Sequence, residues 1–154
     1  MFNSSIDKVI FAAGSGGKNV KKVDQEGAKR LVDAANKNGV KKFVMLSSMG
    51  ADNPEEADDL KDYLKAKHNA DEYLKNSGLT YAIVRPGSLT NNKLTNCIEL
   101  EVKLNKQGEI SRNDVAQTLV RTLNDGVANN STFEIINGKE LIGVALNKVS
   151  ATNN

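Results

Sequence analysis

The stretch KVIFAAG, from Lys8 to Gly14, is a short run of apolar residues that ends in glycine. Such a run, without polar alternation, predicts a β-strand that is buried on both faces, as in a parallel sheet. Two further stretches have the same form: KKFVMLSS, from Lys41 to Ser48, and LTYAIVRPG, from Leu79 to Gly87, in which Pro86 ends the strand. The sequence therefore predicts three buried strands.

Helical periodicity fills both intervals between these strands. From Val20 to Val40 the apolar residues recur at helical spacing, and Asn38-Gly39 is a typical left-handed cap. A second amphipathic segment runs from about Asp58 to Asn76. This alternation predicts right-handed βαβ units, and hence an α/β fold with a parallel sheet and helices on both faces.

Downstream of Gly87 the periodicity is weaker, although a Ser111/Asp114 capping pattern marks the start of one clear amphipathic helix. The expected elements are a polar loop over Ser88–Asn96, a small strand or hairpin over Cys97–Leu104, a helix from Ser111, a strand over Thr132–Gly138, and a tail from Lys139 that begins helical and frays.

The composition fits one globular domain over residues 1–154. Hydrophobic residues make up 39% and charged residues 26% of the chain, which is ordinary globular usage. A net charge of +2, with lysines interleaved among acids, argues against nucleic-acid binding. Since no apolar run is long enough to span a bilayer and no signal-peptide core follows Met1, we expect no membrane partner and a cytoplasmic location.

Cys97 and His68 are the single cysteine and the single histidine. An intrachain disulfide and a cysteine-based metal cluster are therefore impossible, and we expect no metal site. Catalysis by a Ser-His-Asp or Cys-His arrangement is also excluded unless His68 is the catalytic histidine. This histidine falls on the polar arc of its helix.

The three predicted strands end in AAGSGG, LSSMG and RPGS, and ligands of parallel sheets bind beyond such carboxyl ends. Gly14, Gly16 and Gly17 allow a ligand to approach the backbone, but GSGGKN fits neither G-x-G-x-x-G nor the P-loop spacing, so a simple turn is an equal alternative. Ser47 and Ser48 are either strand-end caps or site residues.

Two charged residues fall on helix faces that should pack on the sheet. Lys67 lies with Tyr63 in the apolar arc of the second helix, where an unpaired ammonium costs several kcal/mol. Either Lys67 belongs to a site, or it pairs with Asp71 at the edge of the arc and reaches water. Asp24 lies in the apolar arc of the first helix near Gly27, as a paired structural acid or as part of a site.

Taken in order, VIFAAG, VDQEGAKRLVDAA, VKKFVMLSSMGAD, Tyr63-x-x-x-Lys67, SGLTYAIVRPG and ISRNDVA resemble the atypical short-chain dehydrogenases/reductases, a family of NAD(P)H-binding, NAD-dependent epimerase/dehydratase-like proteins. The resemblance covers Ile6 to about Asn137. Tyr-x-x-x-Lys alone is common by chance, whereas the ordered set of motifs is specific.

The resemblance implies an NAD(P)-dependent oxidoreductase or a sugar-nucleotide epimerase/dehydratase, with NADP or NAD as cofactor and a small-molecule substrate that the sequence does not identify. It implies that Tyr63 is the general acid/base, with a pKa lowered by Lys67, and that Lys67 also binds the nicotinamide ribose. By the same resemblance Ser48 or Ser47 polarises the substrate carbonyl and Asp24 replaces a catalytic Asn. The implied cofactor-binding residues are Ala13 and Gly14 on the adenosine side, Arg85, Pro86 and Gly87 on the nicotinamide side, and Ser47 and Lys67.

Relatives begin with two βα units, about 60 residues that include a G-x-x-G-x-x-G turn, and these have no counterpart here. We therefore expect a partial Rossmann-like fold whose N-terminal strands are missing, and weak cofactor binding by this chain alone because the phosphate-binding turn is absent. The strand Lys8–Ala13 should then be an exposed edge, which favours a homo-oligomer.

Three functions follow from these expectations. The chain is a truncated oxidoreductase that is weak or inactive alone, a non-catalytic nucleotide-sensing or protein-interaction module of the same fold, or a stand-alone enzyme with a small ligand. The motifs favour the first.

Overall fold

A computed structural model describes residues 5–151 of the chain. A six-stranded sheet runs through the molecule in the order β1-β2-β3-β7-β5-β8. Neighbouring strands from β1 to β7 are parallel, whereas β5 is antiparallel to β7 and β8. The predicted α/β fold with a parallel sheet is therefore confirmed. The strands are β1 (Lys8–Phe11), β2 (Lys42–Leu46), β3 (Tyr81–Pro86), β5 (Cys97–Glu101), β7 (Ser131–Asn137) and β8 (Glu140–Leu141).

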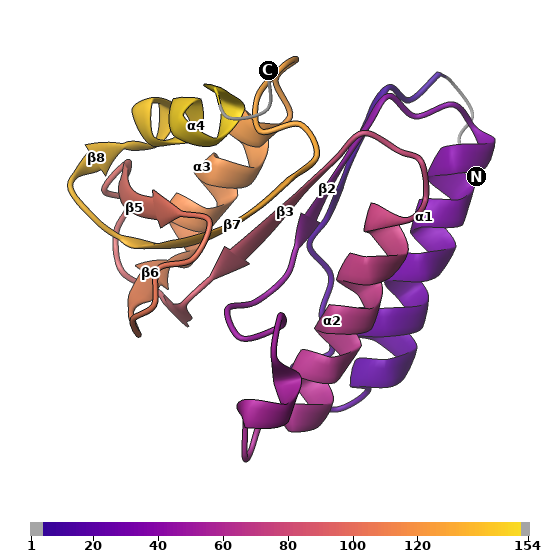
Figure 1. Cartoon of the computed structure of the whole chain (residues 1–154), viewed down its shortest axis with the longest axis horizontal. Coiled ribbons are helices and arrows are strands. Elements are labelled where there is room, and N and C mark those ends of the chain that lie inside the picture. Colours follow the sequence, from indigo (N-terminus) through magenta and orange to yellow (C-terminus); the bar gives the residue numbers. More distant parts are fainter. Residues whose placement is uncertain (1–4, 152–154) are drawn as a thin grey trace.

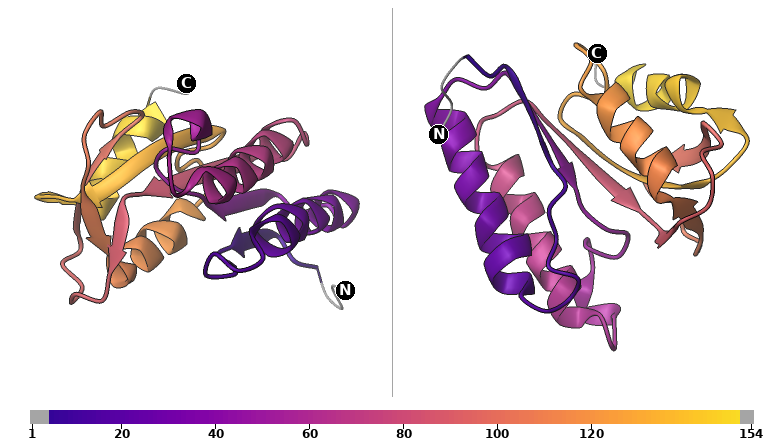
Figure 2. Two further views of the ribbon diagram at one scale, coloured as in Figure 1. Left: turned by 90° about the horizontal axis from the view of Figure 1, so that it is seen from below. Right: turned by 180° about the vertical axis from the view of Figure 1, so that it is seen from behind.

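Helices cover both faces of this sheet, as Figures 1 and 2 show. The first face carries a π-helix η1 (Val20–Gly27) continued by α1 (Ala28–Lys37), and also α2 (Lys61–Lys75). The second face carries α3 (Arg112–Thr122) and α4 (Ile142–Ala151). A short 3-10 helix η2 (Pro54–Glu56) precedes α2.

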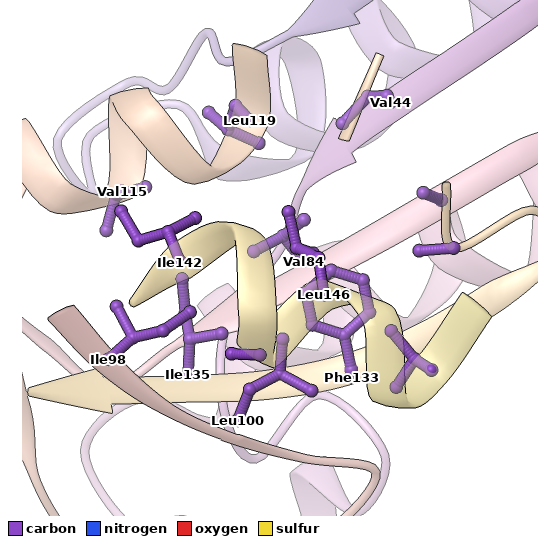
Figure 3. Close-up of a cluster of buried hydrophobic side chains, with 14 of the residues drawn as sticks. Val44, Val84, Ile98, Leu100, Val115, Leu119, Phe133, Ile135, Ile142 and Leu146 are labelled. Carbon is purple, nitrogen blue, oxygen red and sulfur yellow. The ribbon is translucent and has the colours of Figure 1, made fainter. Parts of the chain in front are cut away.

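Alternation along each strand divides the core in two. Phe43, Met45 and Ile83 pack with buried residues of α1 and α2. Val44 and Val84 point the other way, into a larger cluster with residues of α3, α4, β5 and β7 (Figure 3). A strand with helices on both sides needs apolar residues at every position, which is why these strands read as continuous apolar runs.

The structure corrects several predicted boundaries. The first strand ends at Phe11, because Ala12–Gly14 leave the sheet and turn toward a cavity. The first helix begins as a π-helix, a winding that periodicity does not reveal. Its predicted cap is confirmed by Gly39, whose φ is 67°.

Ser88–Asn96 is not entirely a loop, because β4 (Ser88–Thr90) pairs in parallel with β6 (Glu109–Ser111). This small sheet joins backbone segments about twenty residues apart, and short polar strands leave no apolar pattern in the sequence. The strand in Cys97–Leu104, the capped helix after Ser111 and the strand near Thr132 are confirmed. The tail is helical to Ala151, and residues 152–154, where fraying was expected, lie outside the described residues.

Strand β1 lies at one edge of the sheet. It pairs with β2 from Lys8 to Phe11, and no strand among residues 5–151 pairs with its other side. The backbone groups on that side are open to a further strand. Among the described helices, none is long and apolar enough to cross a membrane.

Candidate active site

A cavity of about 570 Å³ lies where the carboxyl ends of β1, β2 and β3 meet. The loop after β1 contributes Ala12–Gly14, Gly16 and Gly17, and the ends of β2 and β3 contribute Ser47–Met49 and Pro86–Gly87. The predicted crevice beyond three parallel strands is therefore present. Gly16 and Gly17 have φ values of 62° and 83°, which favour glycine, so they allow this loop to curve around the cavity.

Lys67 lies in the wall of this cavity and is paired with Asp24. Its Nζ is 3.1 Å from Asp24 Oδ1, and the two side chains are 6% and 1% exposed. The other oxygen of Asp24 accepts hydrogen bonds from the backbone N–H and the hydroxyl of Ser15, at 3.2 and 2.9 Å. The carboxylate thus satisfies the buried ammonium and fixes the loop after β1.

This arrangement excludes the alternative in which Lys67 pairs with Asp71 and reaches water. Asp71 is fully buried, and its Oδ2 accepts from Arg85 Nε and Nη2, at 3.1 and 2.9 Å. The Lys67–Asp71 pair was one of two alternatives, because Asp71 follows Lys67 by one helical turn. An arginine from β3 takes that place because its planar guanidinium makes two hydrogen bonds to one carboxylate.

Tyr63 lies one turn before Lys67 on α2 and also lines the cavity. The Lys67 ammonium is 5.6 Å from the centre of its ring. Burial raises the pKa of Tyr63 above its usual value of 10, the Asp24 charge raises it further, and a hydrogen bond with Ser48 opposes the shift. The predicted lowering of this pKa by Lys67 is therefore wrong, because burial of the phenol and, after it, the Asp24 charge disfavour the phenolate.

A second buried network holds the cavity wall from behind. Ser47 donates its hydroxyl to Asp71 Oδ2 at 2.8 Å, and this is the oxygen to which Arg85 binds. Burial raises the pKa of Asp71, while the Arg85 charge and the two hydrogen-bond donors oppose that shift. The network joins the ends of β2 and β3 to the helix that carries Tyr63, so it fixes the catalytic candidates relative to one another.

Most of the predicted site residues meet at this cavity. Arg85 does not line it, since its buried guanidinium is turned to Asp71. His68 is partly buried, and its Nδ1 lies 2.8 Å from the carbonyl oxygen of Ala51. The predicted residues that line the cavity are Ala13, Gly14, Asp24, Ser47, Ser48, Tyr63, Lys67, Pro86 and Gly87.

Sequence reasoning missed four residues that shape the site. Leu60, Leu89 and Gln107 line the cavity, and Ser15 holds Asp24. Leu89 and Gln107 come from the part of the chain with weak periodicity, so no sequence signal placed them near Tyr63. Ser15 stands between glycines, and a hydroxyl that reaches a helix nine residues later has no local signature.

The lining of the cavity fits the nicotinamide and ribose part of a dinucleotide. The Lys67 ammonium can donate to ribose hydroxyls, and the backbone at Gly16 and Gly17 leaves room for a ligand, since no atom lies where a side chain would stand at either position. Among residues 5–151 no group of His, Cys, Asp and Glu is arranged to hold a metal ion.

Comparison with known proteins identifies the family of the chain. Residues 4–126 match the model of the NAD(P)H-binding family. The chain is 40% identical over 148 residues to the uncharacterised sugar epimerase YhfK of Bacillus subtilis, an alignment that covers 93% of this chain and 69% of YhfK.

Two solved structures are also similar. A Bacillus halodurans protein described as an NAD-dependent epimerase/dehydratase superimposes with a TM-score of 0.91 and 35% identity, over 94% of this chain and 71% of that protein. The Lactococcus lactis oxidoreductase ylbE superimposes with a TM-score of 0.85 and 37% identity, over 93% and 67%. The chain thus spans about two thirds of the length of these relatives. On the extent of the family match and the identity to YhfK, the chain belongs to the NAD(P)H-binding family.

Proposed function

We propose that this cavity binds the nicotinamide end of NADP or NAD and supports hydride transfer to or from a small carbonyl or alcohol substrate. The observation that carries the proposal is the buried Lys67–Asp24 pair beside Tyr63. A buried ion pair is a poor stabilising device, because well-packed apolar residues of similar volume stabilise a fold equally or better. Its place in a cavity wall is better explained by ligand binding.

Each residue then has a defined role. Lys67 binds the ribose hydroxyls, and Asp24 holds the ammonium in the cavity wall through their ion pair. Ser48 contacts the Tyr63 phenol and polarises the substrate carbonyl. Gly14 and Gly87 provide close backbone contact at the two sides of the ligand.

The bound cofactor supplies or accepts the hydride at its nicotinamide ring. When a carbonyl substrate is reduced with that hydride, Tyr63 would donate its phenolic proton to the carbonyl oxygen, so that the product is an alcohol. Because the pKa of Tyr63 is raised, the phenol holds this proton at neutral pH. The phenolate formed in the reaction then recovers a proton from water.

An activity screen with matched variants tests the proposal. The chain is mixed with NADPH or NADH at millimolar concentration and with a panel of aldehydes and ketones, and oxidation of the cofactor is followed by absorbance. We expect Tyr63→Phe to lower any turnover by about 10²- to 10⁴-fold, the usual size of a general-acid contribution. Tyr73→Phe is the control, because Tyr73 lies on the same helix but bonds to Asp33. Turnover that survives Tyr63→Phe and falls with Tyr73→Phe rejects the assignment.

A non-catalytic nucleotide-binding role is the second proposal, and the same panel separates it from the first. Cofactor binding that depends on Lys67, with no substrate turned over by the wild-type chain, favours a sensing module. The relatives are longer than the region that this chain matches, and that additional length is compatible with a catalytic role and with a sensing role.

A further inference from the structure

Ser47 lines the proposed active site just after the end of β2, and its hydroxyl is bound to a buried carboxylate behind the cavity wall. The residue is 3% exposed, and its Oγ donates to Asp71 Oδ2 at 2.8 Å. Arg85 donates to the same oxygen from Nε and Nη2, at 3.1 and 2.9 Å. Three donors therefore converge on one oxygen of a fully buried residue.

The direction of the Ser47 hydrogen bond does not depend on the protonation of Asp71. Since three donors occupy Oδ2, a proton on this carboxyl group can sit only on Oδ1, which has no hydrogen-bond partner among the described residues. Oδ2 is thus an acceptor in both forms. If Ser47 turned its proton elsewhere, two acceptor oxygens would face each other at 2.8 Å. Asp71 therefore takes the single proton that Ser47 can donate.

The Ser47 hydroxyl is left with acceptor capacity alone for a ligand. A serine hydroxyl has one O–H donor and two lone pairs. Within residues 5–151 no donor reaches Ser47 Oγ, so the protein uses neither lone pair. Ser47 can therefore bind an N–H or O–H group in the cavity, but it cannot donate to a carbonyl oxygen.

The neighbouring Ser48 has the opposite polarity. Its Oγ donates to the Met49 carbonyl oxygen at 3.2 Å. Its hydrogen bond with Tyr63 opposes the rise in the pKa of that phenol, as a donor to the phenolate does. Of the two serines that the family resemblance implies for polarising a substrate carbonyl, Ser48 is the one that has a proton to donate.

We infer that Asp71 is a positioning residue that makes Ser47 the acceptor for the carboxamide NH₂ group of the nicotinamide ring. This inference rests on the proposed function, which places that ring in the cavity. The nitrogen of an amide NH₂ group only donates, so it complements an oxygen that can only accept. The ribose hydroxyls, which are the other donors at this end of the cofactor, are assigned to Lys67. A hydrogen bond to the carboxamide restricts rotation of the ring and so selects the ring face that meets the substrate.

Two cofactors that differ only at this group test the inference. In the 3-acetylpyridine analogue of NADPH a methyl group replaces the NH₂ group, and the carbonyl is retained. Each cofactor is titrated into the ¹⁵N-labelled chain, and the backbone amide shifts of Gly14 and Gly87 give the two dissociation constants. We expect the wild-type chain to bind NADPH about 5-fold or more tightly than the analogue, which corresponds to one hydrogen bond.

Ser47→Ala removes the acceptor. This variant should bind NADPH about 5-fold or more weakly than the wild type does, and it should bind the two cofactors equally. The control is Ser77→Ala, at a serine just beyond the C-terminal end of α2 whose hydroxyl donates to the Leu74 carbonyl oxygen. The control should keep the wild-type preference for NADPH.

Asp71→Asn tests the positioning role. The amide of the new side chain can present its NH₂ group to Ser47, which then accepts from it and turns its own proton into the cavity. This variant should therefore lose the preference for NADPH. A purely structural role of Asp71 predicts instead that both cofactors bind more weakly and that the preference remains. If the variant does not fold, Ser47→Ala decides the inference alone.

The outcomes separate this inference from the proposed function. Equal binding of the two cofactors by the wild-type chain overturns the inference and leaves the proposed function in place. A preference for NADPH that survives in Ser47→Ala has the same consequence. A wild-type chain that binds neither cofactor rejects the proposed function, and the inference with it.

Discussion

The Nζ atom of Lys67 lies 3.1 Å from Oδ1 of Asp24, and both side chains are buried in the wall of the larger cavity. This contact connects the π-helix η1 to α2. Through the two hydrogen bonds from Ser15 it also connects both helices to the glycine-rich loop after β1. A single carboxylate therefore fixes three parts of the site.

The first prediction concerns the stability of this pair. Asp24→Leu should lower the free energy of unfolding by about 3–5 kcal/mol, because it leaves the Lys67 ammonium buried without a partner. The double variant Asp24→Leu/Lys67→Met should lose clearly less, since it removes both charges. Urea unfolding of both variants measures the difference, with Lys65→Met, at an exposed lysine of α2, as control. A double variant as unstable as the single one contradicts the account.

The second prediction concerns the protonation of Tyr63. Burial and the Asp24 charge raise the pKa of Tyr63, so its phenol should titrate above pH 10. The raised folded pKa stabilises the protein below the unfolded value of about 10, and this contribution is lost as the pH rises through the folded pKa. NMR of ζ-¹³C-labelled tyrosine measures the titration, and Tyr63→Phe assigns the signal.

The control for this titration is Asp33→Asn. A hydrogen bond to Asp33 raises the pKa of Tyr73, so this variant should lower the pKa of Tyr73 and leave that of Tyr63 in place. A Tyr63 phenol that titrates near pH 8 would restore the sequence-based view that Lys67 governs it.

The third prediction uses Lys42, which is buried at the start of β2 and donates to the carbonyl oxygens of Asn124 and Val127 at 3.0 and 2.6 Å. Burial lowers its pKa to about 8, and the neighbouring charge of Lys8 acts in the same direction. Between pH 8 and about 10.4 the unfolded chain retains the proton that the folded chain releases, so stability should rise with pH by up to about 1.4 kcal/mol per unit. The difference in unfolding free energy between wild type and Lys42→Met, measured across this range, should grow. Lys41→Met, at an exposed neighbour, should show no such growth.

The fourth prediction is that a second copy of the chain pairs with the free edge of β1. The open backbone groups beside Lys8–Phe11 favour strand addition, and a twofold axis can join two such edges. Light scattering over a range of concentrations should give a mass that rises toward that of a dimer. A constant monomer mass at the highest concentration rejects this expectation.

Much of the fold could be predicted because buried parallel strands leave continuous apolar runs. The stretches around Ile10, Val44 and Val84 predicted three parallel strands, and the rule for parallel sheets placed their ends at one crevice. Charged residues in apolar arcs then identified Asp24 and Lys67, because a buried charge needs a partner.

The sequence could not identify the partners of these charges. Asp71 lies one turn after Lys67 on α2, whereas Asp24 lies in η1. Asp71 nevertheless binds Arg85 of β3, and Lys67 pairs with Asp24. Such pairing depends on how helices pack on the sheet, which no local pattern records. The direction of the pKa shift of Tyr63 was missed for the same reason, because it depends on the burial of the phenol and on the charge of Asp24.

The residues after Gly87 that line the cavity could not be predicted from the sequence either. Leu89 lines the cavity from β4, and Gln107 lines it from the segment just before β6, the strand with which β4 pairs. Strands of three residues are held by backbone hydrogen bonds and carry no periodicity.

The most direct test of the central claim is an NMR titration of the ¹⁵N-labelled chain with NADPH. The account predicts shifts of the backbone amides of Gly14, Ser48 and Gly87, their loss in Lys67→Met, and their retention in Lys65→Met. Shifts that lie away from these three residues, or that are unchanged in Lys67→Met, would contradict the claim that the Lys67–Asp24 cavity binds the cofactor.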